Sequence, residues 1–112
     1  MDAMSTTPYE IDVETLKAMA DGGEPHVILD VREPWEVATC AFADAVHVPM
    51  QQIPHSLDKV PSDKTVVVVC HHGVRSQHVM SFLRHQGYEN ATSLRGGIDA
   101  WAKRIDTSMG TY

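Results

Sequence analysis

The sequence predicts a single α/β domain with a mostly parallel sheet that helices cover on both faces. Short apolar runs alternate along the chain with segments of helical periodicity, the pattern of βα units. The run Val66–Val69 holds four consecutive valines, which is typical of a strand buried on both faces of a parallel sheet. A chain of 112 residues is long enough to bury the core of one such domain.

Five apolar runs are the predicted strands, namely residues 9–11, 27–29, 45–48, 65–69 and 91–94. Asp12 and Pro34 suit the starts of two helices, because aspartate caps free N–H groups and proline fits the first turn. The segments 76–86 and 98–105 show helical spacing of apolar side chains and predict two further helices. A short helical stretch is expected at 56–59.

Composition restricts the class of protein. A net charge of −6 argues against a general nucleic-acid surface, and no apolar run approaches the roughly 18 residues of a membrane span. Two cysteines do not make a disulfide framework, and the N-terminus lacks the pattern of a signal peptide. We therefore expect a cytoplasmic protein with a flexible N-terminus at 1–8, one domain at 9–106 and a tail at 107–112.

Cys70 follows the valine strand directly and opens a tight loop before the next helix. Ligands of parallel sheets bind beyond the carboxyl ends of the strands. Amides of the loop and of the helix N-terminus would point at the sulfur and favour the thiolate, which is the nucleophilic form. Cys70 is therefore predicted to be a nucleophile; the alternative is a small buried apolar residue at a strand end.

The residues after Cys70 allow two interpretations each. His71 and His72 either line the pocket and contact a donor's oxyanion or form an inert rim, and Arg75 either contacts an anion or pairs with a nearby carboxylate. Gly73 is expected to supply a backbone angle that a side chain would forbid. Neighbouring side chains in a tight turn are expected to diverge, and no other cysteine, histidine or carboxylate has an obvious convergent spacing, so we predict no metal site. We also expect no cofactor.

Three residues outside the loop complete the candidate set. Asp30 and Arg32 end the neighbouring strand, where they either border the pocket or form an ion pair that fixes the following helix. Cys40 is either a relay thiol or an incidental small residue.

Four segments in this order resemble a single-domain rhodanese-like sulfurtransferase, and the resemblance runs from about residue 11 to residue 105. They are Asp30–Glu36, Val48–Pro49, Cys70–Ser76 and Leu94–Trp101. The resemblance implies a five-stranded parallel sheet with helices on both faces. It also implies that Cys70 takes a sulfane sulfur from a donor such as thiosulfate and passes it, as a persulfide, to a thiophilic acceptor. That acceptor would be cyanide in vitro and a thiol or a protein in the cell.

Carried over residue by residue, the resemblance makes Cys70 the sulfur carrier. The substrate-binding loop is then formed by His71, His72, Gly73, Val74 and Arg75. One segment departs from the family pattern, because residues 40–45 replace the usual Gly-His-Ile-Pro-Gly-Ala. Asp44 stands where the second glycine would be, and aspartate tolerates unusual backbone angles better than most residues.

Two other functions compete with sulfur transfer. A cysteine phosphatase or arsenate reductase would need arginine at position 76, where this chain has serine, and the shorter loop suits a sulfur atom better than a phosphate. A non-catalytic or regulatory module of the same scaffold usually lacks the loop cysteine, which is present here as Cys70. A free-standing enzyme and a sulfur carrier for a protein partner both remain open.

Overall fold

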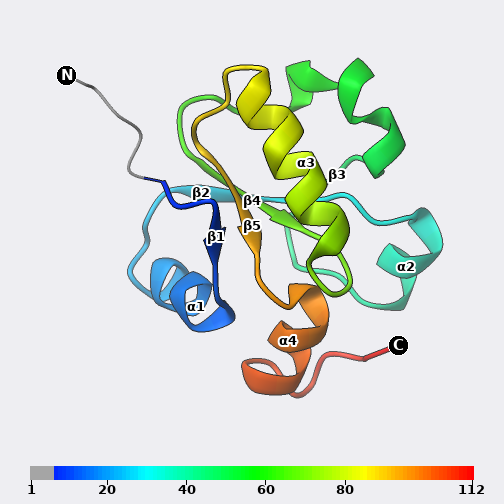
Figure 1. Ribbon diagram of the computed structural model, residues 1–112. Coiled ribbons are helices and arrows are strands. Elements are labelled where there is room, and N and C mark those ends of the chain that lie inside the picture. Colours follow the sequence, from blue (N-terminus) through cyan, green and yellow to red (C-terminus); the bar gives the residue numbers. More distant parts are fainter. Residues whose placement is uncertain (1–6) are drawn as a thin grey trace.

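A five-stranded, all-parallel sheet forms the centre of the computed structural model, which describes residues 7–112 (Figure 1). The spatial order is β1-β5-β4-β2-β3. The strands are β1 (Glu10–Ile11), β2 (His26–Asp30), β3 (Val46–His47), β4 (Thr65–Val69) and β5 (Ala91–Leu94). The predicted parallel sheet is confirmed, with shorter outer strands than the apolar runs suggested.

Four α-helices connect or follow these strands. They are α1 (Val13–Asp21), α2 (Pro34–Thr39), α3 (Val74–His85) and α4 (Gly97–Arg104). Asp12 caps α1 as predicted, since its carboxylate accepts the N–H of Thr15 at 2.8 Å. The α3 helix begins two residues earlier than its apolar pattern indicated, directly after Gly73.

The segment between β3 and β4 differs from the prediction of one short helical stretch at 56–59. It holds two 3₁₀ helices, η1 (Met50–His55) and η2 (Leu57–Lys59). Pro54 lies inside η1 and has no N–H to donate, which disfavours a regular α-helix there. Tighter 3₁₀ turns are common in short connections of this kind.

The valines of β4 pack on both faces of the sheet, as their composition predicted. Val66 and Val68 share one apolar cluster with side chains of α3. Val67 and Val69 share a second cluster with α1 and α4. All four valines have no exposed surface, so β4 is the central buried strand that carries Cys70 at its carboxyl end.

Residues 40–45, between α2 and β3, are the segment whose sequence differs from the family pattern. The chain turns there at Asp44, whose φ of 62° lies in the left-handed region. Among the described residues, Asp44 is the non-glycine residue with such an angle. The aspartate thus does what glycine would do at this place, as the sequence suggested.

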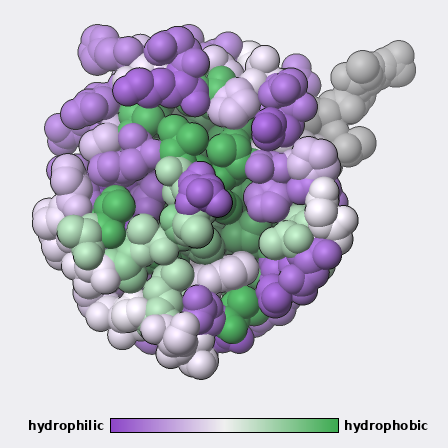
Figure 2. All heavy atoms as spheres, turned by 180° about the vertical axis from the view of Figure 1, so that it is seen from behind, coloured by the Kyte–Doolittle hydropathy of each residue, from purple (hydrophilic) through white to green (hydrophobic). Residues whose placement is uncertain are grey.

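The surface of the molecule mixes apolar and polar residues. Seen from behind, apolar residues gather near the centre of the face, with hydrophilic residues mainly above and to the right of them and residues of intermediate hydropathy below (Figure 2). Within the part of the chain that the structure describes, no helix is long and apolar enough to cross a membrane. The predicted loose segment 1–8 lies mostly outside the described residues, and residues 107–112 contain no helix or strand.

Candidate active site

Cys70 lies at the carboxyl end of β4, and only 1% of its surface is exposed. Its Sγ accepts two backbone hydrogen bonds, from the N–H of Gly73 at 3.0 Å and from the N–H of Ser76 at 3.4 Å. N–H groups directed at sulfur stabilise a negative charge on it. The inward-facing amides that the sequence predicted are therefore present, and they suit a thiolate or another sulfur anion.

Two glycines allow the loop to close. Gly73 has a φ of 107°, and a Cβ there would lie 3.2 Å from the amide nitrogen of Gly96. Gly97 has a φ of 62°, and a Cβ there would overlap the carbonyl oxygens of Cys70 and His71. This close approach places the first turn of α4 directly against the loop.

The contact between α4 and the loop is made of hydrogen bonds. The N–H of Ile98 donates to the carbonyl of Cys70 at 2.9 Å, and the N–H of Asp99 donates to the carbonyl of His71 at 3.1 Å. Free N–H groups at the start of a helix are ready donors for such carbonyls. Helix α4 thereby fixes the peptide planes on which the direction of the loop amides depends.

A pair of buried hydroxyl groups lies behind the sulfur. The Cys70 thiol can donate to Ser76 Oγ at 3.5 Å, and Ser76 Oγ lies 2.7 Å from Ser93 Oγ on β5. Ser76 Oγ also donates to the carbonyl of Gly73 at 3.1 Å. Both serines are fully buried, so these hydroxyls have only each other, the sulfur and the loop as partners. Sequence reasoning missed Ser93, because a serine in a buried strand carries no signal of its own.

Arg75 pairs with a carboxylate, which was one of its two predicted roles. Its Nη1 and Nη2 donate to Glu36 Oε1 and Oε2 at 2.7 and 2.8 Å. The hydrogen bonds from Arg75 are the main reason that the pKa of Glu36 falls to about 2. The same carboxylate raises the pKa of Arg75. Arg75 thus ties the start of α3 to α2.

Asp30 and Arg32 form an ion pair beneath the surface. Arg32 Nη2 lies 2.7 Å from Asp30 Oδ2, and both side chains are almost completely buried. Arg32 also donates to the carbonyls of Glu36 and Cys40. Of the two predicted roles, the geometry favours fixing helix α2, since neither side chain is exposed at the pocket. Cys40 contributes its carbonyl to this arrangement.

Tyr112 reaches the site although the sequence placed it in a tail. Its hydroxyl donates to Glu36 Oε2 at 2.7 Å and accepts from Arg32 Nη1 at 3.1 Å. Burial raises the pKa of Tyr112 to about 12. Its ring stacks on His71, with centroids 3.8 Å apart and planes 8° apart. A tyrosine after the last helix has no periodic pattern, so local sequence signals could not have found this contact.

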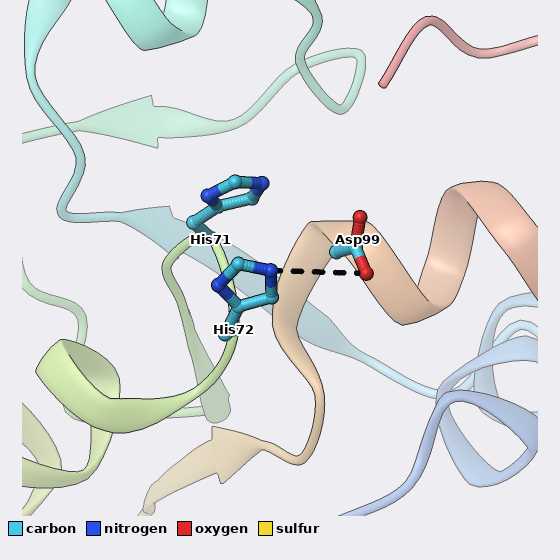
Figure 3. A group of neighbouring side chains, drawn as sticks. All are labelled: His71, His72 and Asp99. Carbon is cyan, nitrogen blue, oxygen red and sulfur yellow. Dashed lines mark ion pairs between the residues drawn. The ribbon is translucent and has the colours of Figure 1, made fainter. Parts of the chain in front are cut away.

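His71 and His72 do not diverge as expected. Their rings stack with centroids 3.9 Å apart, and His72 Nε2 lies 3.9 Å from Asp99 Oδ2 (Figure 3). Burial lowers the pKa of His71, and its Nε2 is shielded without a hydrogen-bond partner among the described residues. Lys103 Nζ also contacts Asp99, at 3.1 Å.

One ligand atom from each of His71, His72 and Asp99 lies within 4.8 Å of the others, so this is the group that comes nearest to a metal site. The nitrogen lone pairs of stacked imidazoles lie in the two ring planes, however, and run side by side. A metal ion needs lone pairs that converge on one point at about 2.0–2.1 Å. The stacked arrangement therefore favours a rim of the pocket over a metal site.

The rim of the site also carries two exposed apolar side chains. Val74, the first residue of α3, is 66% exposed, and Trp35 on α2 is 64% exposed. The Trp35 ring meets Tyr112 edge to face at 5.7 Å. A separate cavity of about 470 Å³ between Tyr9 and α3 has no lining residue from the Cys70 loop.

Residues 12–104 match the family of the rhodanese-like domain. A protein of Allochromatium vinosum named "Sulfurtransferase" is 39% identical over 94 residues, which are 84% of this chain and 88% of that protein. The "Thiosulfate sulfurtransferase GlpE" of Vibrio cholerae is 32% identical over 91 residues, 81% of this chain and 85% of that protein. A solved rhodanese-like domain protein from Staphylococcus aureus superposes with a TM-score of 0.81 and 30% identity, covering 94% of this chain and 99% of that one.

Proposed function

Because this chain belongs to the rhodanese-like family of sulfurtransferases, we propose that it moves a sulfane sulfur from a donor to a thiophilic acceptor through a persulfide on Cys70. The observation that carries the proposal is the pair of N–H groups, from Gly73 and Ser76, directed at Sγ. The same two donors serve the thiolate before transfer and the persulfide anion after it.

In the first step the Cys70 thiolate attacks the outer sulfur of the donor. A new S–S bond forms to Cys70, and the donor's own bond to that sulfur breaks with its electron pair leaving on the donor. With thiosulfate the leaving group is sulfite; with a thiol persulfide it is a thiolate. Loop residues His71, His72, Gly73, Val74 and Arg75 surround this exchange, Arg75 by holding the loop through Glu36.

In the second step an acceptor attacks the outer sulfur of the persulfide, and Cys70 leaves as the thiolate that began the cycle. Cyanide, a small thiol and a protein thiol are acceptors of the right chemistry. Such double-displacement reactions divide one transfer into two easier ones. Both cysteines of the chain are free, which suits a reducing compartment such as the cytoplasm.

The test is intact mass after incubation with thiosulfate and, separately, with cysteine persulfide. Gain of one sulfur atom by the parent protein and none by Cys70→Ser would support the persulfide, and cyanide should then remove the sulfur as thiocyanate. Uptake from neither donor would overturn the proposal and leave a non-catalytic binding module. Phosphate release from an aryl phosphate would instead favour the phosphatase reading.

A further inference from the structure

We infer that the site takes its sulfur from a thiol persulfide in preference to a free inorganic dianion such as thiosulfate. This inference rests on the proposed sulfur transfer and concerns the chemical class of the donor. It follows from the charges and the apolar side chains that surround Cys70.

The arginine of the loop is compensated by a carboxylate. Both terminal nitrogens of Arg75 donate to Glu36, at 2.7 and 2.8 Å, and Tyr112 donates to the same carboxylate. The Arg75 side chain is 31% exposed, so one part of it faces the solvent, but its charge is matched at contact distance. A matched pair attracts a dianion far less than a free guanidinium would.

The other strong cations around the loop are compensated in the same way. Arg32 is buried against Asp30 and offers no surface to a donor. Lys103 lies 3.1 Å from Asp99, and the same carboxylate lies 3.9 Å from His72. Figure 3 shows Asp99 beside His72, and the same carboxylate pairs with Lys103, so Asp99 compensates the two residues there that could otherwise attract an anion.

The remaining rim is aromatic or apolar. His71 lies between the rings of Tyr112 and His72, which cover both of its faces. Val74 and Trp35 expose most of their side chains. The protein as a whole carries a net charge of −6, which adds repulsion for dianions. A rim of this kind suits the carbon atoms that a thiol persulfide has and thiosulfate lacks.

The two reactions differ in the negative charge that the mouth of the site, meaning the rim around Cys70, must accommodate. With thiosulfate, a thiolate and a dianion give a persulfide anion and sulfite, so two negative charges leave through the mouth. With a protonated thiol persulfide, the Cys70 thiolate takes the outer sulfur together with its proton and becomes Cys70–S–SH, while the old S–S bond breaks and its electron pair leaves on one thiolate. The second reaction places less negative charge beside a rim whose cations are already matched by Asp99 and Glu36, and electrostatic matching to developing charge is a main source of rate differences.

The experiment measures second-order rates of sulfur loading by intact mass, with thiosulfate and with cysteine persulfide as donors. Each rate is divided by the rate at which N-acetylcysteine takes up sulfur from the same donor. This ratio removes the intrinsic reactivity of the donor. Mass also separates a gained sulfur atom from a mixed disulfide. We expect the normalised rate to favour cysteine persulfide by at least about tenfold, or about 1.4 kcal/mol in activation free energy.

A gain-of-charge variant tests the cause. Val74→Arg places an unpaired cation at the loop and should raise thiosulfate loading by about tenfold, with a rate that falls as salt is added. Asp63→Asn changes the net charge by the same amount at an exposed position before β4, at the opposite end of the strand, and should change loading little. Val74→Gln controls for loss of the valine.

The outcomes separate the two proposals. A normalised rate for thiosulfate equal to or above that for cysteine persulfide would overturn the donor preference while leaving sulfur transfer intact. Equal effects of Val74→Arg and Asp63→Asn would overturn the local electrostatic cause. Loading from neither donor would overturn sulfur transfer itself, and the donor preference with it.

Discussion

Arg75 and Glu36, 39 positions apart in the chain, meet in two hydrogen bonds of 2.7 and 2.8 Å that join the Cys70 loop to helix α2. The Glu36 side chain is 4% exposed and that of Arg75 is 31% exposed, so the pair is partly shielded from water. A shielded, bidentate pair holds its partners in one geometry more firmly than a surface ion pair does. The loop therefore depends on a residue of another helix, which makes no hydrogen bond to the sulfur among the described residues.

The first prediction concerns the loss of that carboxylate. Glu36→Gln leaves Arg75 without its charged partner and weakens the hydrogen bond that Glu36 accepts from Tyr112, and it should lower the free energy of unfolding by about 1–3 kcal/mol. Urea unfolding followed by circular dichroism measures it. The exposed Glu24→Gln is the matched control and should shift the midpoint little. Equal midpoints for the two variants would show that the pair adds nothing to stability.

Acid should weaken the fold through the same residue. The folded pKa of Glu36, about 2, lies below its ordinary value of 4.5. Its contribution is therefore complete above 4.5 and is lost as the pH falls toward 2, an effect on the order of 2 kcal/mol. Unfolding free energies measured from pH 6 to pH 2 should show a shallower decline in Glu36→Gln than in the parent. Parallel curves for the two proteins would contradict this assignment.

The buried hydroxyl pair should matter for the reactivity of Cys70. When the thiol loses its proton, Ser76 can turn its hydroxyl to the sulfur while Ser93 donates to Ser76 Oγ. Ser93→Ala removes that second donor and should slow alkylation of Cys70 by iodoacetamide about three- to tenfold at neutral pH, as expected for one lost hydrogen bond of about 1 kcal/mol.

Thr92→Val is the matched control for Ser93→Ala. Thr92 neighbours Ser93 on β5, is equally buried, and has a hydroxyl without a partner among the described residues. Its removal should leave alkylation unchanged and raise stability by up to about 1 kcal/mol, because an unsatisfied buried hydroxyl is lost. Similar slowing in both variants would point to general loosening of the strand and against a role of the hydroxyl pair.

Gly97 should be the glycine least tolerant of substitution. A Cβ at this position overlaps the carbonyls of Cys70 and His71, and its φ of 62° adds strain. Gly97→Ala should cost about 2–4 kcal/mol of stability and slow Cys70 alkylation. Gly23 has a similar φ of 68° and open space around it, so Gly23→Ala should cost only about 1 kcal/mol. Thermal unfolding of both variants measures the two stability losses. Their difference is the part due to overlap of the added Cβ with the loop carbonyls, because backbone strain is common to both positions.

Tyr112 makes two kinds of contact that can be tested separately, one through its hydroxyl and one through its ring. Tyr112→Phe removes the hydroxyl between Arg32 and Glu36 but keeps the ring on His71, and should cost about 1 kcal/mol of stability. Tyr112→Ala also uncovers His71, whose labelling by diethyl pyrocarbonate should then rise several-fold when followed by peptide mass spectrometry. Tyr9→Phe, at an exposed tyrosine, should change neither. Unchanged labelling in Tyr112→Ala would show that the stacked ring does not shield His71.

The parts of the fold that could be predicted are those with a local pattern. The valines of β4 predict a strand buried on both faces, and the spacing of the apolar side chains in α4 predicts a helix with one apolar stripe. The segment 50–59 was predicted poorly because proline at 54 and short 3₁₀ turns disturb the helical period. Strand ends were uncertain because pairing with neighbours, which sequence periodicity does not report, decides where β1 and β3 stop.

The candidate site divides in the same way. Cys70 and Gly73 were predictable because a short loop between a strand and a helix determines their geometry. Arg75 was left with two roles, since its partner Glu36 comes from another helix. Ser93 and Tyr112 were missed because they act through contacts that form only when distant parts of the chain pack together. The stacking of His71 on His72 was predicted wrongly, because Tyr112 holds the ring of His71 from its other face.

The hydrogen bonds from Ile98 and Asp99 to the carbonyls of Cys70 and His71 have a consequence for local opening of the fold. The loop cannot keep its shape when the first turn of α4 unwinds, so fluctuations of α4 and exposure of the thiol form one cooperative event. Amide hydrogen exchange at Ile98 should then share its opening free energy with the slow trapping of Cys70 by a bulky thiol reagent. The stability of a helix that begins 27 residues after Cys70 in the chain thus limits access to its thiol.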